Sequence, residues 1–292
     1  MKDNIVKNVA ALAIQKIGNT ISISLDSIVI SAYLGLATVA IYGNYYYVIS
    51  AITTFITLIY SSVTASVGNS IATETIEKNS IDFDTFSFLN IWIIGWCCIC
   101  FMCLFQDFME IWMGKDFLFP ISVVLTLVLR FFFGQIRKVV LTYKDAAGIW
   151  WPDKWRPLLG CIVNLSLNIF LVKKIGVAGV AISTIISYVF IEHPWETHVL
   201  FRDYFHKKEL KYYMKMLYYI AGIVIAGVVS FVFCAMLPLS GVVAIIIKLV
   251  ICIVLSNGII LLMNFWTKDF KNGYKTMVMI FSSFMNWLGK SN

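Results

Sequence analysis

Charged residues are scarce in this sequence. Only 13% of the 292 residues are charged, while 60% are apolar. A soluble domain is nearer a quarter charged and half apolar, because its surface must be polar. The apolar residues gather in runs of about 20, which is enough to cross roughly 30 Å of hydrocarbon. The shortage of charge therefore excludes an ordinary soluble domain and predicts a membrane protein.

The alternation of apolar and polar residues that marks membrane β-strands is also missing. The runs are continuously apolar, and a helix is the structure that satisfies its own backbone hydrogen bonds inside lipid. The predicted fold is all-α, a bundle of about eight transmembrane helices. They are expected near Val9–Leu34, Val39–Ile71, Phe86–Phe105, Phe119–Tyr143, Leu158–Val172, Val177–Ile191, Met216–Met236 and Val242–Phe265.

Motifs of catalysis are absent as well. The sequence contains no phosphate-binding glycine-rich loop, no nucleophile elbow and no His-Glu-x-x-His pair, and its loops are short, so neither an enzyme nor a cofactor is expected. The seven cysteines all lie in apolar runs. Cys100 and Cys103 have a spacing found in zinc sites, but no second pair follows at a suitable distance. Neither a metal site nor a disulfide framework is predicted.

Basic residues outnumber acidic ones and give a net charge of +7. In a soluble protein this would suggest nucleic acid as a partner. Here fifteen loop or tail lysines and arginines fall on one predicted side of the membrane and three on the other. The positive-inside rule then places both termini in the cytoplasm. We expect a multi-pass protein surrounded by membrane lipids, without a nucleic-acid partner.

Five charged residues within or near the ends of the apolar runs stand out: Lys16, Asp26, Arg130, Arg137 and Lys248. The first four are candidates for lining a cavity, and Lys248 is expected to reach the interface. A charge inside the bilayer costs several kcal/mol, so it normally faces a partner or a water-filled space. Arg130 and Arg137 are seven residues apart and share one helical face. Arginine binds phosphate bidentately, so a positively lined cavity suits a phosphate-bearing substrate. Snorkelling to the interface, or an ion pair with Asp26, are the alternatives.

Two further polar groups allow both a functional and a simpler interpretation. Asn44 and Tyr45 belong to an Asn-Tyr-Tyr-Tyr patch that suits a sugar, although tyrosines are common at any membrane interface. Three histidines and two glutamates follow the sixth apolar run, and a solvated loop is the favoured interpretation for them: Glu192, His193, Glu196, His198 and His206.

A stretch in the middle of the chain carries a family resemblance. It reads TYKDAAGIWWPDKWRPLLG and continues into a Lys-x-x-Gly-x-x-Gly turn at Lys173, Gly176 and Gly179. An earlier stretch, LDSIVISAYLGLATVAIYGNYYYVIS, fits the same pattern. The chain resembles the Wzx-type polysaccharide and O-antigen flippases of the multidrug/oligosaccharidyl-lipid/polysaccharide exporter superfamily.

The resemblance implies a particular organisation. Residues 1–200 would form the six-helix C-terminal lobe of such a flippase, with a fold like that of the related multidrug exporters. Residues 201–292 would add a basic cytoplasmic loop, an extra helical pair and a cytoplasmic tail. The first lobe of the family is expected to be missing, so a first-lobe fragment or polysaccharide assembly proteins are expected partners.

The resemblance also implies a function. The chain would export a lipid-linked oligosaccharide, carried on undecaprenyl pyrophosphate, across the bacterial cytoplasmic membrane during surface polysaccharide biosynthesis. Two alternatives stay open at this point. One is a cation-coupled multidrug or metabolite exporter of the same superfamily, and the other is an inactive fragment.

Overall fold

A computed structural model describes residues 2–237 and 241–278, without the side chains of 2–5, 22 and 23. The described part of the chain is helical almost throughout and contains no strand. Six helical stretches are long and apolar enough to cross a membrane. The predicted all-α class is therefore confirmed, and the number of such stretches is lower than the eight expected from the sequence.

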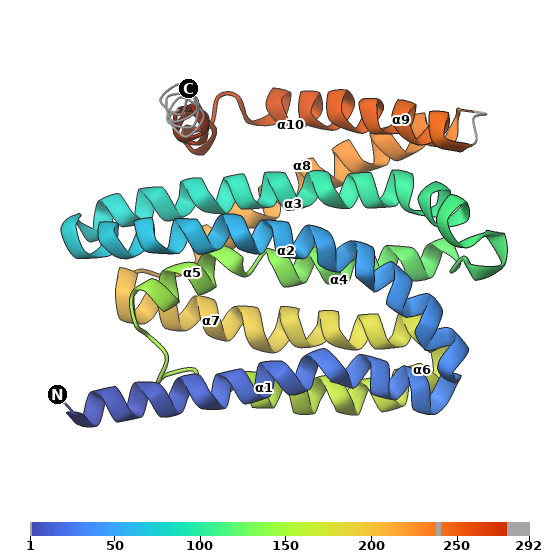
Figure 1. Cartoon of the computed structure of the whole chain (residues 1–292). Helices are drawn as coiled ribbons and strands as arrows, with labels where there is room; N and C mark the ends of the chain where they lie inside the picture. The colour runs from blue at the N-terminus through green and yellow to red at the C-terminus, as the bar shows by residue number, and fades with distance from the viewer. Residues whose placement is uncertain (1, 238–240, 279–292) are drawn as a thin grey trace, which may run out of the picture.

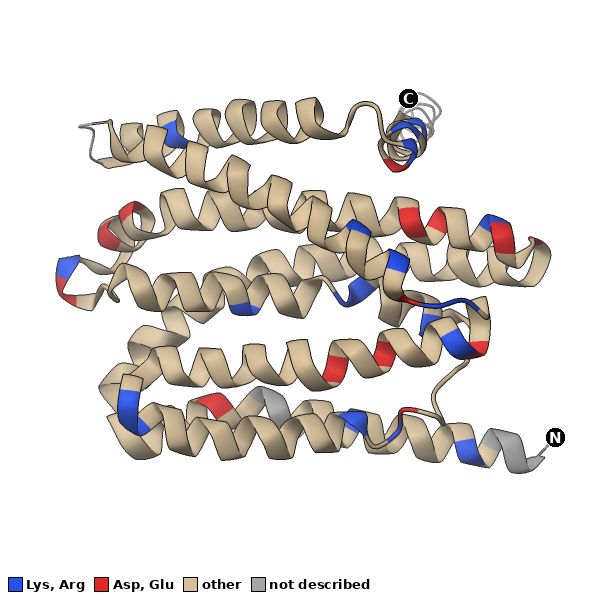
Figure 2. Cartoon of the chain, turned by 180° about the vertical axis from the view of Figure 1, so that it is seen from behind, with Lys and Arg blue, Asp and Glu red and all other residues tan. Residues whose placement is uncertain are grey.

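The helices form an up-and-down bundle whose loops lie at two opposite ends (Figure 1). They are α1 (Lys2–Leu34), α2 (Leu36–Thr73), α3 (Ile76–Met113), α4 (Ile121–Gln135), α5 (Lys138–Ala146), α6 (Arg156–Ser187), α7 (His193–Leu200), α8 (Leu210–Ala235), α9 (Gly241–Ile251) and α10 (Asn257–Asn264). Short π-helical segments join α6 to α7, follow α7, and join α9 to α10. Charged residues gather near the two ends of the bundle and are sparse between them (Figure 2).

Helix α6 reverses direction within its own span. Ile175 and Gly176 have non-helical dihedral angles, and Gly176 adopts φ 60°, a conformation that glycine adopts without strain. The two limbs run side by side, because Asn164 donates to Thr184 at 2.9 Å and Ser187 donates to the carbonyl of Gly160 at 3.0 Å. Two predicted segments thus coincide with the two limbs of one element.

The fourth predicted segment, Phe119–Tyr143, is not one continuous helix. It is divided into α4 and α5 by a turn at Ile136 and Arg137. At the break, Asn90 of α3 donates to the backbone carbonyl of Gln135 at 3.1 Å. A neighbouring helix thereby hydrogen-bonds to the backbone at the break, as is expected of a break inside a membrane bundle.

Helix α3 connects the early helices to α8, α9 and α10. At Gly95 of α3, an added Cβ would lie 2.4 Å from the side chain of Ile223 on α8, so the absence of a side chain permits this close approach. Lys215 of α8 also bridges Asp84 on α3 and Asp269, at 2.8 Å in each case. These contacts join the region after residue 200 directly to the region before it.

Candidate functional site

A cavity of about 440 Å³ opens among α1, α2, α4, α5 and α6. Its size falls within the range of pockets that hold small ligands. Four basic and two acidic residues are part of the lining: Arg130, Arg137, Lys138, Arg156, Asp145 and Glu192. Amide, hydroxyl and tyrosine side chains complete the polar surface: Gln15, Asn19, Tyr46, Thr53, Gln135, Asn164, Thr184, Ser187 and Tyr188.

Arg130 lies in the cavity wall and is paired across the bundle. Its Nη2 atom is 2.6 Å from Oδ2 of Asp26 on α1, and its Nη1 atom donates to the hydroxyl of Tyr42 at 2.6 Å. Asn168 of α6 donates to the other carboxylate oxygen of Asp26 at 3.1 Å. Asp26 is 2% exposed and the Arg130 side chain 13% exposed. The structure thus combines two sequence hypotheses, because Arg130 has an ion-pair partner and also faces the cavity.

Arg137, in the turn before α5, belongs to a buried network of six charges that reaches the π-helical segment Tyr188–Glu192, α7 and the start of α6. Its Nη2 atom is 2.5 Å from Glu192 and 2.6 Å from Glu196. Arg156 binds the same two carboxylates, at 2.8 Å and 2.7 Å.

The network continues to the loop after α5. Arg156 also binds Asp153 at 3.0 Å, and Lys144 forms an ion pair with Asp153 that is fully buried on both sides. Gln15 of α1 donates to the second oxygen of Asp153 at 2.9 Å. Three basic and three acidic side chains therefore balance in charge, which offsets part of the cost of removing them from water.

Lys138 differs from the other basic residues of the cavity. Its Nζ atom donates to Thr57 of α2 at 3.2 Å, and it forms no ion pair with any carboxylate in the described residues. Asp145, at the same side of the cavity, is exposed and accepts a hydrogen bond from Trp150 at 3.0 Å. Lys138 is therefore the cavity's lysine with free capacity to bind an anion.

Arg130 and Arg137 are the two predicted site residues that line the cavity, and Asp26 contacts it through Arg130. Lys16 is exposed on α1 and lies outside the lining, where its neighbours Gln15 and Asn19 take part instead. Gln15 and Asn19 are four residues apart and share a face, while Lys16 is turned by about 100° from Gln15, away from the cavity.

The expected sugar patch at Asn44 and Tyr45 also lies outside the lining. Tyr45 is fully buried, where its hydroxyl donates to Gln106 at 2.8 Å and accepts from the backbone of Phe119 at 3.1 Å. Tyr42 and Tyr46 reach Arg130 instead, and the Tyr46 ring lies 5.5 Å from its guanidinium carbon. Tyr42 and Tyr46 are four residues apart and therefore lie on the same face of α2, the face that meets Arg130. This spacing was the sequence signal for their role.

The interpretation of Glu192, His193 and Glu196 as a solvated loop is wrong, because all three are buried. The helix continues through Pro194, which follows directly on the π-helical segment Tyr188–Glu192, where the regular backbone hydrogen-bond pattern is already interrupted. Glu192 and Glu196 are four residues apart and share the face that meets Arg137. The position of Arg137 in an apolar run was the sequence signal for their burial, because a buried arginine requires acidic partners.

The arrangement can bind a polar ligand with negative charge inside an otherwise apolar bundle. Guanidinium and ammonium groups offer charge-assisted hydrogen bonds to phosphate oxygens, and amides and hydroxyls can bind sugar hydroxyls. No protein-family model, curated protein or solved structure matches this chain. A function must therefore be argued from the chemistry of the cavity and from the resemblance of individual motifs.

Proposed function

We propose that this chain is a membrane transport protein that flips a lipid-linked oligosaccharide, bound through its pyrophosphate, across a bacterial cytoplasmic membrane. The observation that carries the proposal is the polar cavity in the apolar bundle, with Arg130, Arg137 and Lys138 in its wall. The resemblance to Wzx-type flippases supplies the substrate class.

The charge of the cavity supports a phosphate ligand. Three of the four basic lining residues are paired with carboxylates, whereas Lys138 bonds to the neutral hydroxyl of Thr57, so its ammonium group has free capacity for an oxyanion. Arg130 lies in the same cavity and is bound on one side by Asp26, while its planar donor fork can serve an oxyanion on the open side. A pyrophosphate would gain ionic hydrogen bonds there that a neutral substrate would not.

The remaining lining supports a sugar beside the phosphate. Tyr46 and Tyr188 offer aromatic faces, and Gln15, Asn19 and Asn164 offer amides. A volume of about 440 Å³ suits the pyrophosphate with the first sugars of a repeat unit rather than a long chain. The size therefore fits recognition of the lipid-proximal end of the cargo.

The exposed face of helix α2 beside the cavity carries hydroxyl side chains, which suits contact with water or with another protein segment. Thr54, Thr57, Ser61 and Ser62 are exposed on it, and each hydroxyl donates to a carbonyl of its own helix. Hydroxyls bound in this way tolerate lipid, yet small polar residues are enriched where membrane helices meet one another. We propose that this face contacts a second lobe, as expected for a transporter that alternates between two repeats.

The finer topology is part of the proposal. The chain would cross the membrane about eight times, counting the two limbs of α6 separately and α4 with α5 as one crossing. The predicted excess of basic residues at the end that holds the N-terminus supports placing both termini in the cytoplasm.

The cation-coupled exporter is less well supported. Such a transporter needs a carboxylate in the cavity that is free to take up a cation, and the deep acid of the sequence, Asp26, is bound by Arg130 and Asn168. Asp26 is therefore not free for that role, which leaves Asp145 as the lining carboxylate without an ion-pair partner among the described residues.

Binding by the full chain in lipid nanodiscs tests the proposal. A fluorescent undecaprenyl-pyrophosphate oligosaccharide should bind saturably and be displaced by undecaprenyl pyrophosphate, but not by undecaprenol. Saturable binding of a cationic dye, with no binding of the pyrophosphate lipid, would instead favour the exporter. Equal displacement by undecaprenol would show that the lipid tail alone is recognised and would contradict the proposal.

A further inference from the structure

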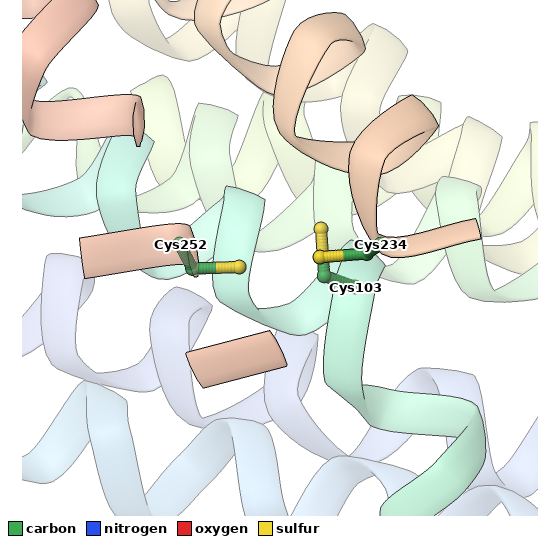
Figure 3. A group of neighbouring side chains, drawn as sticks. All are labelled: Cys103, Cys234 and Cys252. Atoms are coloured by element: carbon green, nitrogen blue, oxygen red, sulfur yellow. The ribbon is translucent and has the colours of Figure 1, made fainter. Parts of the chain in front are cut away.

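Three cysteines from distant parts of the sequence meet in the C-terminal part of the bundle, away from the cavity. Cys103 lies on α3, Cys234 near the end of α8, and Cys252 at the start of the π-helical segment Cys252–Ser256. All three are buried, and their sulfur atoms lie within 4.8 Å of one another. Figure 3 shows the side chain of Cys252 directed toward the adjacent sulfurs of Cys103 and Cys234.

The spacing of these sulfurs is close to that of a metal–thiolate site. With metal–sulfur bonds of about 2.3 Å, two sulfurs of one site can be at most about 4.6 Å apart. The three thiols need to move by only a few tenths of an ångström to share one ion. No metal site was predicted from the sequence, because no second thiol pair follows Cys100 and Cys103 at a suitable distance. The fold brings Cys234 and Cys252 to Cys103 from other helical segments.

The backbone conformation and the charged residues near the three cysteines differ from those of an ordinary apolar core. Cys252 opens a π-helical segment, a local deformation that is frequent at functional sites. Lys248 lies one helical turn before Cys252, and Asp107 lies one helical turn after Cys103. The two residues form an ion pair at 2.5 Å between α9 and α3. Cys103 and Cys252 thus each lie one helical turn from a member of this ion pair. Lys248 therefore has an ion-pair partner within the bundle, contrary to the expectation that it reaches the interface.

We propose that Cys103, Cys234 and Cys252 form a binding site for one soft, thiophilic metal ion of the Cu(I) class. Three thiolates suit Cu(I), whereas structural zinc sites take four ligands. Ligation forms metal–sulfur bonds and releases the proton of each thiol that becomes a ligand. The site ties α3, α8 and the π-helical segment Cys252–Ser256 together, and it stands independently of the proposed transport function.

The experiment uses the full chain, purified under reducing and oxygen-free conditions, with Cu(I) as the probe and a chromogenic Cu(I) chelator as the competitor. We expect one Cu(I) per chain that resists the competitor, and a copper-edge X-ray absorption spectrum with sulfur neighbours alone at about 2.3 Å. Replacement of any one ligand, as in Cys103→Ser, Cys234→Ser or Cys252→Ser, should weaken binding about tenfold or more.

Cys161→Ser is the matched control, because Cys161 is also buried but lies on α6, outside the cluster. It should retain the affinity of the parent chain. Failure of the parent chain to hold Cu(I) against the chelator would overturn the proposal, as would oxygen or nitrogen neighbours in the absorption spectrum. An equal loss in Cys161→Ser would do the same. The spectrum of the parent chain keeps the test decisive even where a serine variant does not insert.

Discussion

The guanidinium of Arg130 on α4 lies 2.6 Å from the carboxylate of Asp26 on α1, across the bundle. This pair sits beside the cavity and fixes the orientation of the arginine that faces it. Its partners Tyr42 and Asn168 come from α2 and α6, so four helices meet at one ionic contact. The pair therefore has a structural role and positions a group for ligand binding.

Removing one member of this pair should destabilise the chain. Asp26→Asn leaves Arg130 buried and unpaired, a change that typically costs about 3–5 kcal/mol. The double variant Asp26→Asn with Arg130→Gln removes both charges and should recover much of that loss. Thermal unfolding in detergent measures both, and additive losses in the double variant would show that the two residues do not interact.

The buried network around Arg137 leads to a second prediction. Glu196→Gln should lower the unfolding temperature strongly, because Glu196 binds both Arg137 and Arg156 and has no exposed surface. Glu77→Gln is the control, since Glu77 is exposed at the start of α3, and it should change stability by less than about 0.5 kcal/mol. Similar effects of the two substitutions would place Glu196 in solvent after all.

Tyr45 offers a test of the revised role of the tyrosine patch. Tyr45→Phe removes the hydroxyl that joins Gln106 to the backbone of Phe119, and should destabilise the chain by about 1–3 kcal/mol. Affinity for the pyrophosphate lipid should not change, because Tyr45 is outside the cavity. Tyr47→Phe, at an exposed position of the same helix, is the control for stability. A loss of lipid affinity in Tyr45→Phe at unchanged stability would restore the original sugar-site hypothesis.

Topology can be measured by labelling single cysteines with a membrane-impermeant reagent in intact cells. Glu110 and Glu77 are exposed near opposite ends of α3. In a cysteine-free background, Glu110→Cys should be labelled from outside, and Glu77→Cys only after permeabilisation, because the basic end is expected in the cytoplasm. The reverse pattern would invert the proposed orientation.

The helical fold was predictable because continuous apolar runs and the scarcity of charge each constrain it locally. Where the prediction differed, tertiary contacts decided. Asn90 stabilises the break before Arg137 by binding the carbonyl of Gln135, and Gly176 lets α6 reverse within one element. Neither contact is visible in the hydrophobic periodicity, which is the pattern on which the prediction of helices rests.

The site was predictable in part for the same reason. A charge in an apolar run is recognisable as unusual, which identified Arg130, Arg137 and Asp26. Their partners are distant in sequence, and the phase of each helix decides which neighbour faces the cavity, so Gln15 replaced Lys16 and Tyr46 replaced Tyr45. The three-cysteine cluster depends on α3, α8 and the π-helical segment Cys252–Ser256 meeting, which no local spacing could indicate.

The most direct test of the central claim is the affinity of undecaprenyl pyrophosphate for the full chain and for Lys138→Gln in nanodiscs. Lys138 lines the cavity without a carboxylate partner among the described residues, so its neutral replacement should leave the fold intact and weaken binding about tenfold, or about 1.4 kcal/mol. Lys208→Gln, an exposed lysine in the loop before α8, should bind as the parent does. Unchanged affinity in Lys138→Gln, with the parent binding saturably, would contradict the claim that this cavity holds the pyrophosphate.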